Sequence, residues 1–125
     1  MDNIVIRFAK IVEKIHDEMN VGIYASMADN TGSMIACIKM GEVARASFEI
    51  SQKKTMTAFE FKNYTDVIYN VLSKIGTQPL IDGKYCFLPG GVVLHDNLQR
   101  EFFIGISTNN PDIDKEIAKK LSTVL

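Results

Sequence analysis

The stretch from residue 21 to residue 39 constrains the fold most, because it predicts a β-hairpin without help from the rest of the chain. Residues 21–28 and 33–39 have the composition of strands. Between them lies Asp29-Asn30-Thr31-Gly32, whose residue types tolerate left-handed backbone conformations. We expect Asp29 to cap this turn, because aspartate readily accepts bonds from N–H groups two residues on. A role for Asp29 as a general base is the alternative.

Helical spacing predicts helices on both sides of this hairpin. Residues 3–19 alternate apolar and charged positions with the period of an amphipathic helix, and residues 42–61 and 64–72 predict two more. In the helix over 42–61 the small residues favour close packing against a sheet or a second copy, and the predicted buried stripe consists of Val43, Ala46, Ile50, Thr57 and Phe61.

Three further strands and a last helix are expected in the second half. Thr65 is a candidate N-cap for the helix over 64–72, and residues 74–84 are rich in helix breakers. Residues 85–88, 92–95 and 101–107 are predicted strands, and Asn110 with Pro111 predicts the start of a final helix. The order α-β-β-α-α-β-β-β-α predicts an α/β fold of the α+β type, with a central, mainly antiparallel sheet flanked by helices.

Composition excludes several classes of partner. The 125 residues fit one domain, 1–125, and a net charge of −1 gives no electrostatic case for nucleic acid or an anionic membrane. No signal peptide or membrane-spanning apolar run is visible, so a cytoplasmic location is expected. Cys37 and Cys86 each lie in an apolar run, which predicts buried free thiols, although a bridge between them stays open.

The break Pro89-Gly90-Gly91 is the strongest candidate for a ligand site. It separates two apolar β-type runs with a rigid residue followed by two that have no side chain. Such a segment lets another group approach the backbone closely, and its N–H groups can bind a carboxylate or a phosphate. A tight strand connection is the alternative explanation.

Several segments together resemble the GlcG/HbpS-like family, also called the haem-degrading domain family, which includes the C-terminal domain of PduO. The resemblance covers roughly residues 4–125. It is carried, in the order of the family, by Ala28-Asp29-Asn30-Thr31-Gly32, Lys39-Met40, Ala46-Ser47-Phe48-Glu49-Ile50-Ser51 with Lys54, Pro89-Gly90-Gly91, and Gly105-Ile106-Ser107 with Asp114.

This resemblance implies a profilin-like fold, a homodimer or a higher homo-oligomer, and haem as a candidate cofactor. Ser47 and Lys54 lie seven residues apart and therefore on nearly the same helix face. Given the resemblance, Lys54 is a candidate partner for an anionic group such as a haem propionate, and Ser47 a candidate donor beside it. A solvated lysine is the ordinary alternative.

His16 and His95 are candidate haem ligands, since a neutral imidazole suits iron, although both lie among polar residues as surface histidines do. The sequence has no HExxH, CxxC or carboxylate-histidine cluster, and no readable nucleophile–base pair.

Three functions remain open from the sequence. The first is a small, soluble, oligomeric accessory protein that binds haem, a corrinoid-related molecule or a small anionic metabolite in a catabolic or cofactor-handling pathway. The second is a weak enzyme, haem-degrading or a small-molecule lyase or hydrolase, if Ser47, Lys54 and Asp29 converge. The third is a ligand-free structural or assembly subunit.

Overall fold

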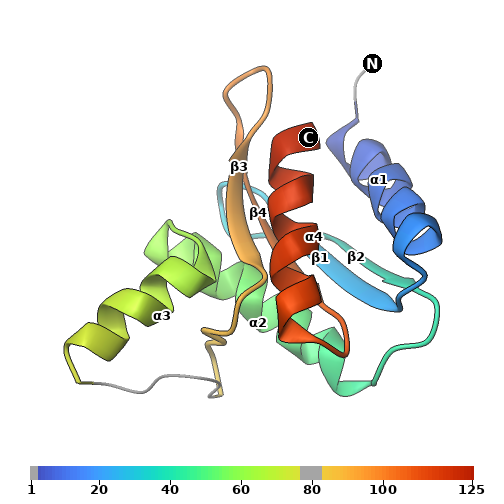
Figure 1. The fold of residues 1–125 in the computed structure, drawn as a ribbon. Helices are drawn as coiled ribbons and strands as arrows, with labels where there is room; N and C mark the ends of the chain where they lie inside the picture. Colours follow the sequence, from blue (N-terminus) through green and yellow to red (C-terminus); the bar gives the residue numbers. More distant parts are fainter. Residues whose placement is uncertain (1–2, 77–82) are drawn as a thin grey trace.

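Helices and strands follow the predicted order with one exception. The computed structural model describes residues 3–76 and 83–125 (Figure 1). Its elements are α1 (Ile4–Met19), β1 (Ile23–Ala28), β2 (Met34–Met40), α2 (Ala46–Phe61), α3 (Thr65–Lys74), β3 (Gly91–His95), β4 (Glu101–Ser107) and α4 (Pro111–Val124). No helix in these two described ranges is long and apolar enough to cross a membrane.

The exception is the segment 85–88, which was predicted as a strand and is not one. Two of its backbone groups bond to side chains of helices. The Cys86 N–H donates to Thr57 Oγ1 of α2 at 3.0 Å, and the Leu88 carbonyl accepts from Thr65 Oγ1 of α3 at 2.7 Å. The apolar run therefore packs as an irregular segment under two helices.

The sheet has four antiparallel strands in the order β2-β1-β4-β3. The predicted hairpin joins β1 to β2, and a second hairpin joins β3 to β4. The central pair β1 and β4 comes from opposite ends of the chain, with Ser26 opposite Gly105. These pairings confirm the predicted fold class of an antiparallel sheet flanked by helices.

The two faces of the sheet are covered differently. Figure 1 shows α4 and α1 on one face and α2 crossing the other. Between the sheet and the α1–α4 pair lies the main hydrophobic core, in which Phe8, Val12, Ile104 and Leu121 are fully buried. The apolar stripe predicted for the first helix is confirmed here.

The buried face of α2 differs from the predicted stripe. The side chains it buries are mostly polar or small, namely Ser47, Ser51, Lys54, Thr55, Thr57 and Ala58. Phe61 of the predicted stripe is instead 44% exposed. The helix buries short side chains because Gly105 of β4, which lies opposite, has no side chain and lets the α2 backbone come close to the sheet. The expected close packing of this helix against the sheet is confirmed. Short polar side chains line the contact and bond to each other, for example Ser51 Oγ to Ser26 Oγ at 2.8 Å.

The helix caps confirm one prediction and correct another. Asn110 caps α4 as predicted, accepting from the Asp112 N–H at 2.9 Å. Thr65 is not the cap of α3, because it is already helical and Tyr64 occupies the cap position. The Thr65 hydroxyl bonds instead to the Leu88 carbonyl and to the Gly91 N–H. It ties α3 to the segment before β3.

The two cysteines are free thiols in different surroundings. Cys86 is buried as predicted, and burial raises the pKa of its thiol above the ordinary value. Cys37 on β2 is exposed, so the prediction that it is buried was wrong. β2 lies at an edge of the sheet, where apolar sequence need not be covered.

Asp29 caps the β1–β2 turn as predicted. Its Oδ1 accepts from the Thr31 hydroxyl at 2.6 Å and from the N–H groups of Thr31 and Ser33 at 2.9 and 3.2 Å. These bonds, the Thr31 hydroxyl first, hold the pKa of the Asp29 carboxyl below its ordinary value. The stabilisation is therefore present above the unfolded-state pKa and is lost as pH falls through the lower, folded-state pKa.

We predict that Thr31→Val raises the pKa of Asp29, because the variant loses the hydroxyl donor and keeps the backbone donors. Carboxyl-carbon NMR across an acid titration measures the change. An unchanged pKa in the variant would show that the hydroxyl does not contribute.

Candidate functional site

A buried ion pair lies beneath the Pro-Gly-Gly segment. Lys54 Nζ of α2 is 2.8 Å from Asp114 Oδ2 of α4, and the two side chains are 1% and 4% exposed. Nζ also donates to the Ile106 carbonyl at 2.8 Å. The other carboxylate oxygen of Asp114 accepts from the Thr108 N–H at 2.6 Å and from the Thr108 hydroxyl at 2.5 Å. Every charge in this cluster therefore has bonded partners.

The two glycines are required because the chain passes directly over this cluster. Gly90 has φ of +122°, and a Cβ there would lie 2.6 Å from the Ile106 carbonyl oxygen and 3.0 Å from Lys54 Nζ. A Cβ on Gly91 would lie 2.4 Å from Thr65 Cγ2. In this structure the groups that approach the glycine backbone closely are the protein's own.

The predicted ligand-binding residues lie close together, but mostly inside the molecule. Lys54 contacts Gly90, and Ser47 Oγ donates to the Thr108 carbonyl at 3.4 Å, one residue after β4. The Gly91 N–H donates to Thr65 Oγ1 at 3.0 Å. A direct contact of Ser47, Lys54, Gly90 or Gly91 with a ligand stays a prediction, and for Lys54 it requires exchange of the Asp114 partner.

The three polar residues considered for catalysis, Asp29, Ser47 and Lys54, do not bond to one another. The Asp29 carboxylate bonds within its own turn, whereas Lys54 bonds Asp114 and Ser47 bonds the Thr108 carbonyl. None of these hydrogen bonds links one member of the set to another. The geometry offers no nucleophile–base contact among them.

Pro89 is the member of the predicted set that lines a cavity. It is half-buried and borders a hollow of about 340 Å³ between α3, the segment before β3 and the first turns of α4. The other lining residues are Asp66, Tyr69, Asn70, Phe87, Leu88 and Lys115. Sequence reasoning missed the α3 and α4 residues. The one available signal was the spacing of Asp66, Tyr69 and Asn70, which places them on one helix face.

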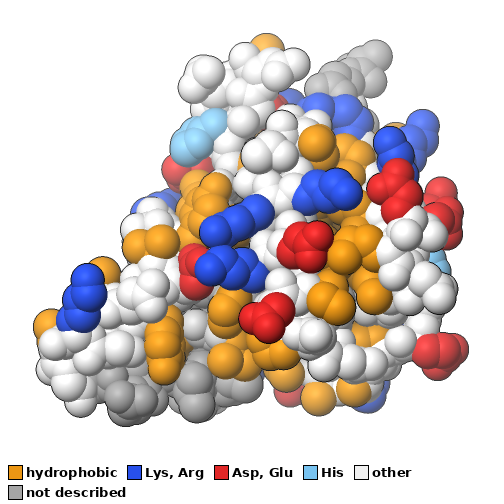
Figure 2. All heavy atoms as spheres, viewed as in Figure 1, with side chains coloured by type: hydrophobic (Ala, Val, Ile, Leu, Met, Phe, Trp, Pro, Cys, Tyr) orange, Lys and Arg blue, Asp and Glu red, His pale blue; other side chains and the backbone are white. Residues whose placement is uncertain are grey.

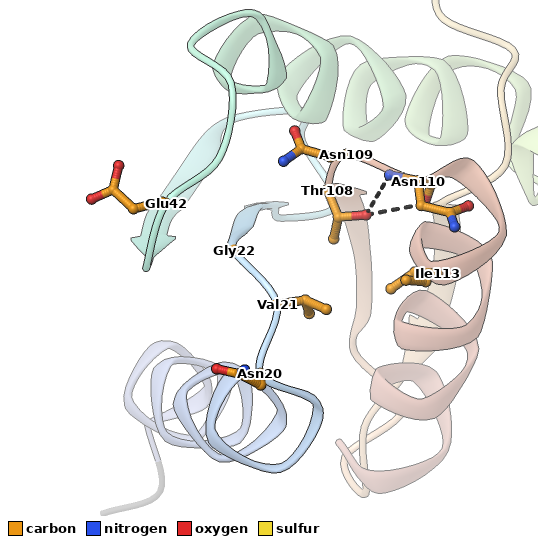
Figure 3. Close-up of a pocket in the computed structure, with 8 residues that line it drawn as sticks. All are labelled: Asn20, Val21, Gly22, Glu42, Thr108, Asn109, Asn110 and Ile113. Atoms are coloured by element: carbon orange, nitrogen blue, oxygen red, sulfur yellow. Dashed lines mark hydrogen bonds between the residues drawn. The ribbon is translucent and has the colours of Figure 1, made fainter.

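A second hollow of about 310 Å³ lies at the N-terminal end of α4 (Figure 3). The connections α1–β1, β2–α2 and β4–α4 meet there. Val21 comes from the α1–β1 link, Glu42 from the segment after β2, and Asn109 from the β4–α4 loop. Thr108 fixes that loop, because its hydroxyl oxygen accepts from the Asn110 N–H at 3.1 Å, as Figure 3 shows. This hollow is mainly polar.

His16 lies beside the second hollow, in the last turn of α1. Its Nδ1 is 2.6 Å from the carbonyl oxygen of Val21, which lines the hollow. A carbonyl can only accept, so Nδ1 carries the proton and a neutral ring has its lone pair on Nε2. The ring also packs against Gly41, where a Cβ would lie 2.5 Å from Cε1.

His95 lies at the end of β3, opposite Glu101 in the β3–β4 ladder. Its side chain is 54% exposed, and Nε2 is 3.2 Å from Glu101 Oε2. In the part of the chain that the structure describes, no three His, Cys, Asp or Glu side chains come together as a metal site. Each histidine is therefore a single candidate ligand.

The fold and the sequence both have known relatives. The structure of a PduOC:haem complex superposes with a TM-score of 0.74 at 21% identity, covering 93% of this chain and 87% of that one. The structure of the Klebsiella pneumoniae protein ORFY superposes with a TM-score of 0.74 at 23% identity, covering 94% of this chain and 86% of that one. A double mutant of HbpS from Streptomyces reticuli superposes with a TM-score of 0.80 at 18% identity, covering 97% of this chain and 83% of that one.

No curated protein sequence matches the chain. The model of the family described as "Haem degrading protein HbpS-like" matches residues 3–122, nearly the whole sequence. The resemblance drawn from the segments around Asp29, Lys54 and Pro89-Gly90-Gly91 is thereby confirmed. The chain belongs to the HbpS-like haem-degrading protein family.

Proposed function

We propose that this protein binds haem and that His16 supplies the axial ligand to the iron. The observation that carries the proposal is the bond from His16 Nδ1 to the Val21 carbonyl. Ligating histidines almost always donate their other ring N–H to such an acceptor, which fixes the tautomer and the ring orientation. Membership of the HbpS-like family and the fold shared with a PduOC:haem complex support the choice of ligand.

The residues around His16 fit this role better than those around His95. Nε2 of His16 has no hydrogen bond or ion pair among the described residues, whereas His95 Nε2 faces the Glu101 carboxylate. Gly41 keeps the space against the His16 ring free of a side chain. Bound haem would supply a redox-active iron, and the protein would hold the imidazole ring, present its lone pair and set the polarity nearby.

We further propose that the protein acts as a homodimer or a higher homo-oligomer. The hollow beside His16, about 310 Å³, is smaller than a tetrapyrrole. A second copy over this surface would shield the exposed part of the ligand from water. Light scattering on a size-exclusion column, with and without hemin, measures the assembly.

We predict that His16→Ala weakens hemin binding at least about tenfold and changes the Soret spectrum, because the variant lacks the axial nitrogen. His95→Ala is the matched control and should bind as the unmodified protein does. The measurement is a spectral titration with hemin, run in parallel with hydroxocobalamin for the corrinoid alternative.

Two results would contradict the proposal. Absence of any saturable Soret shift in the unmodified protein would remove haem as the ligand. Loss of binding in His95→Ala, with His16→Ala unaffected, would transfer the axial role to the β3–β4 hairpin.

A further inference from the structure

We propose that the hollow at Pro89 is a second binding site, which accepts a small carboxylic acid with an aromatic or branched apolar body. This site is separate from the surface around His16. It lies between α3, residues 87–89 and α4. Its volume of about 340 Å³ is at the lower end of the range of small-molecule sites.

The apolar part of the site is built from rigid groups. Phe87 is only 6% exposed and its ring is held edge-on against Phe61, with 5.7 Å between the ring centroids. Leu88 and Pro89 continue the wall, and Tyr69 faces them from α3. Such a wall favours a flat or branched hydrocarbon body, because burying apolar surface between fixed side chains has little ordering cost.

The charged part of the site consists of Asp66 and Lys115, which line the hollow, and of Lys119 beside them. Lys115 Nζ is 3.3 Å and Lys119 Nζ is 4.0 Å from the same oxygen of Asp66. One carboxylate thus pairs with two ammonium groups, so this cluster by itself has one more positive than negative charge. Figure 2, which looks onto α4, shows basic side chains on this face together with hydrophobic and acidic ones. A ligand carboxylate would complete the charge balance, whereas a cation would not.

The buried cluster fixes the two sides of the site relative to each other. Asp114, held by Lys54 and Thr108, immediately precedes Lys115. On the opposite side Gly90, packed against the same Lys54, immediately follows Pro89. The backbone positions that carry the cationic and apolar groups are therefore fixed, and binding requires no rearrangement of the backbone.

The test uses para-fluorobenzoate as the probe and para-fluorobenzyl alcohol as its neutral counterpart. Fluorine NMR gives the affinity and amide NMR maps the site. We expect saturable binding of the acid in the millimolar range or tighter, with shifts at Tyr69, Leu88 and Lys115, and much weaker binding of the alcohol. Lys115→Gln should weaken acid binding about tenfold, since a charge-assisted contact is lost. Lys10→Gln, an exposed lysine on α1, is the control and should have no effect.

Three results would overturn the proposal. They are no saturable binding of the acid, shifts confined to another part of the molecule, and equal binding of the acid and the alcohol. The hemin titration separates this site from the one at His16. If Lys115→Gln weakens hemin binding while the free acid does not bind, the lysine serves a tetrapyrrole carboxylate and the small-acid site is rejected. Acid binding that survives His16→Ala supports two independent sites.

Discussion

Lys54→Met is expected to lower the free energy of unfolding by about 3–5 kcal/mol, the range for breaking a buried ion pair by removal of one partner. The variant leaves the Asp114 carboxylate buried, with Thr108 as its one hydrogen-bond donor among the described residues. It also leaves the Ile106 carbonyl without the ammonium that it accepts from. Urea unfolding followed by circular dichroism measures the loss.

Two further variants show whether the loss comes from the unpaired charge. Lys10→Met on the exposed face of α1 should change stability by less than about 0.5 kcal/mol, as surface substitutions usually do. The double variant Lys54→Met with Asp114→Leu should recover part of the loss, because no buried charge then lacks a partner. A Lys54→Met protein as stable as the Lys10→Met protein would mean that water or a counterion reaches Asp114.

Gly105→Ala is the second substitution with a large expected effect. A Cβ at this position of β4 would lie 2.0 Å from the Ser51 carbonyl oxygen and 2.7 Å from the Thr55 backbone nitrogen. Both atoms belong to the backbone of α2, so the clash cannot be relieved by rotation of a side chain. Overpacking a core typically costs about 1–3 kcal/mol, and we expect about 3 kcal/mol or more here because a whole helix must move.

The matched control is Gly83→Ala, where a Cβ would meet nothing within 4 Å. That variant should unfold within about 0.5 kcal/mol of the unmodified protein. Thermal unfolding of the two variants side by side makes the comparison. Equal stability of Gly105→Ala and Gly83→Ala would show that α2 can move away from the sheet at little cost.

The sequence predicts those features of the fold that depend on local signals. Asp29-Asn30-Thr31-Gly32 specifies its turn, Asn110 and Pro111 start α4, and apolar periodicity gives α1. The strand prediction for residues 85–88 was wrong because a strand-like composition also suits a buried irregular segment. Two of its backbone groups bond to hydroxyls on other elements, those of Thr57 and Thr65.

The candidate site could be predicted only in part, for the same reason. Pro89-Gly90-Gly91 was found because glycine and proline have backbone effects that are readable locally. The surroundings of Lys54 could not be predicted, because its partner Asp114 is 60 residues away and a lysine in a helix is normally solvated. Lys115 and Tyr69 meet at the hollow only through the packing of α3 and α4 around the segment before β3.

The ion pair between Lys54 and Asp114 also determines how the native structure opens. The pair joins α2 to α4 across β4, whose Ile106 carbonyl shares the ammonium. Detaching either helix alone would remove the counter-charge of the residue that stays behind, and a charge left buried without its partner is strongly destabilising. α2, β4 and α4 therefore form one cooperative unit of local unfolding, although each belongs to a different layer and together they span most of the chain.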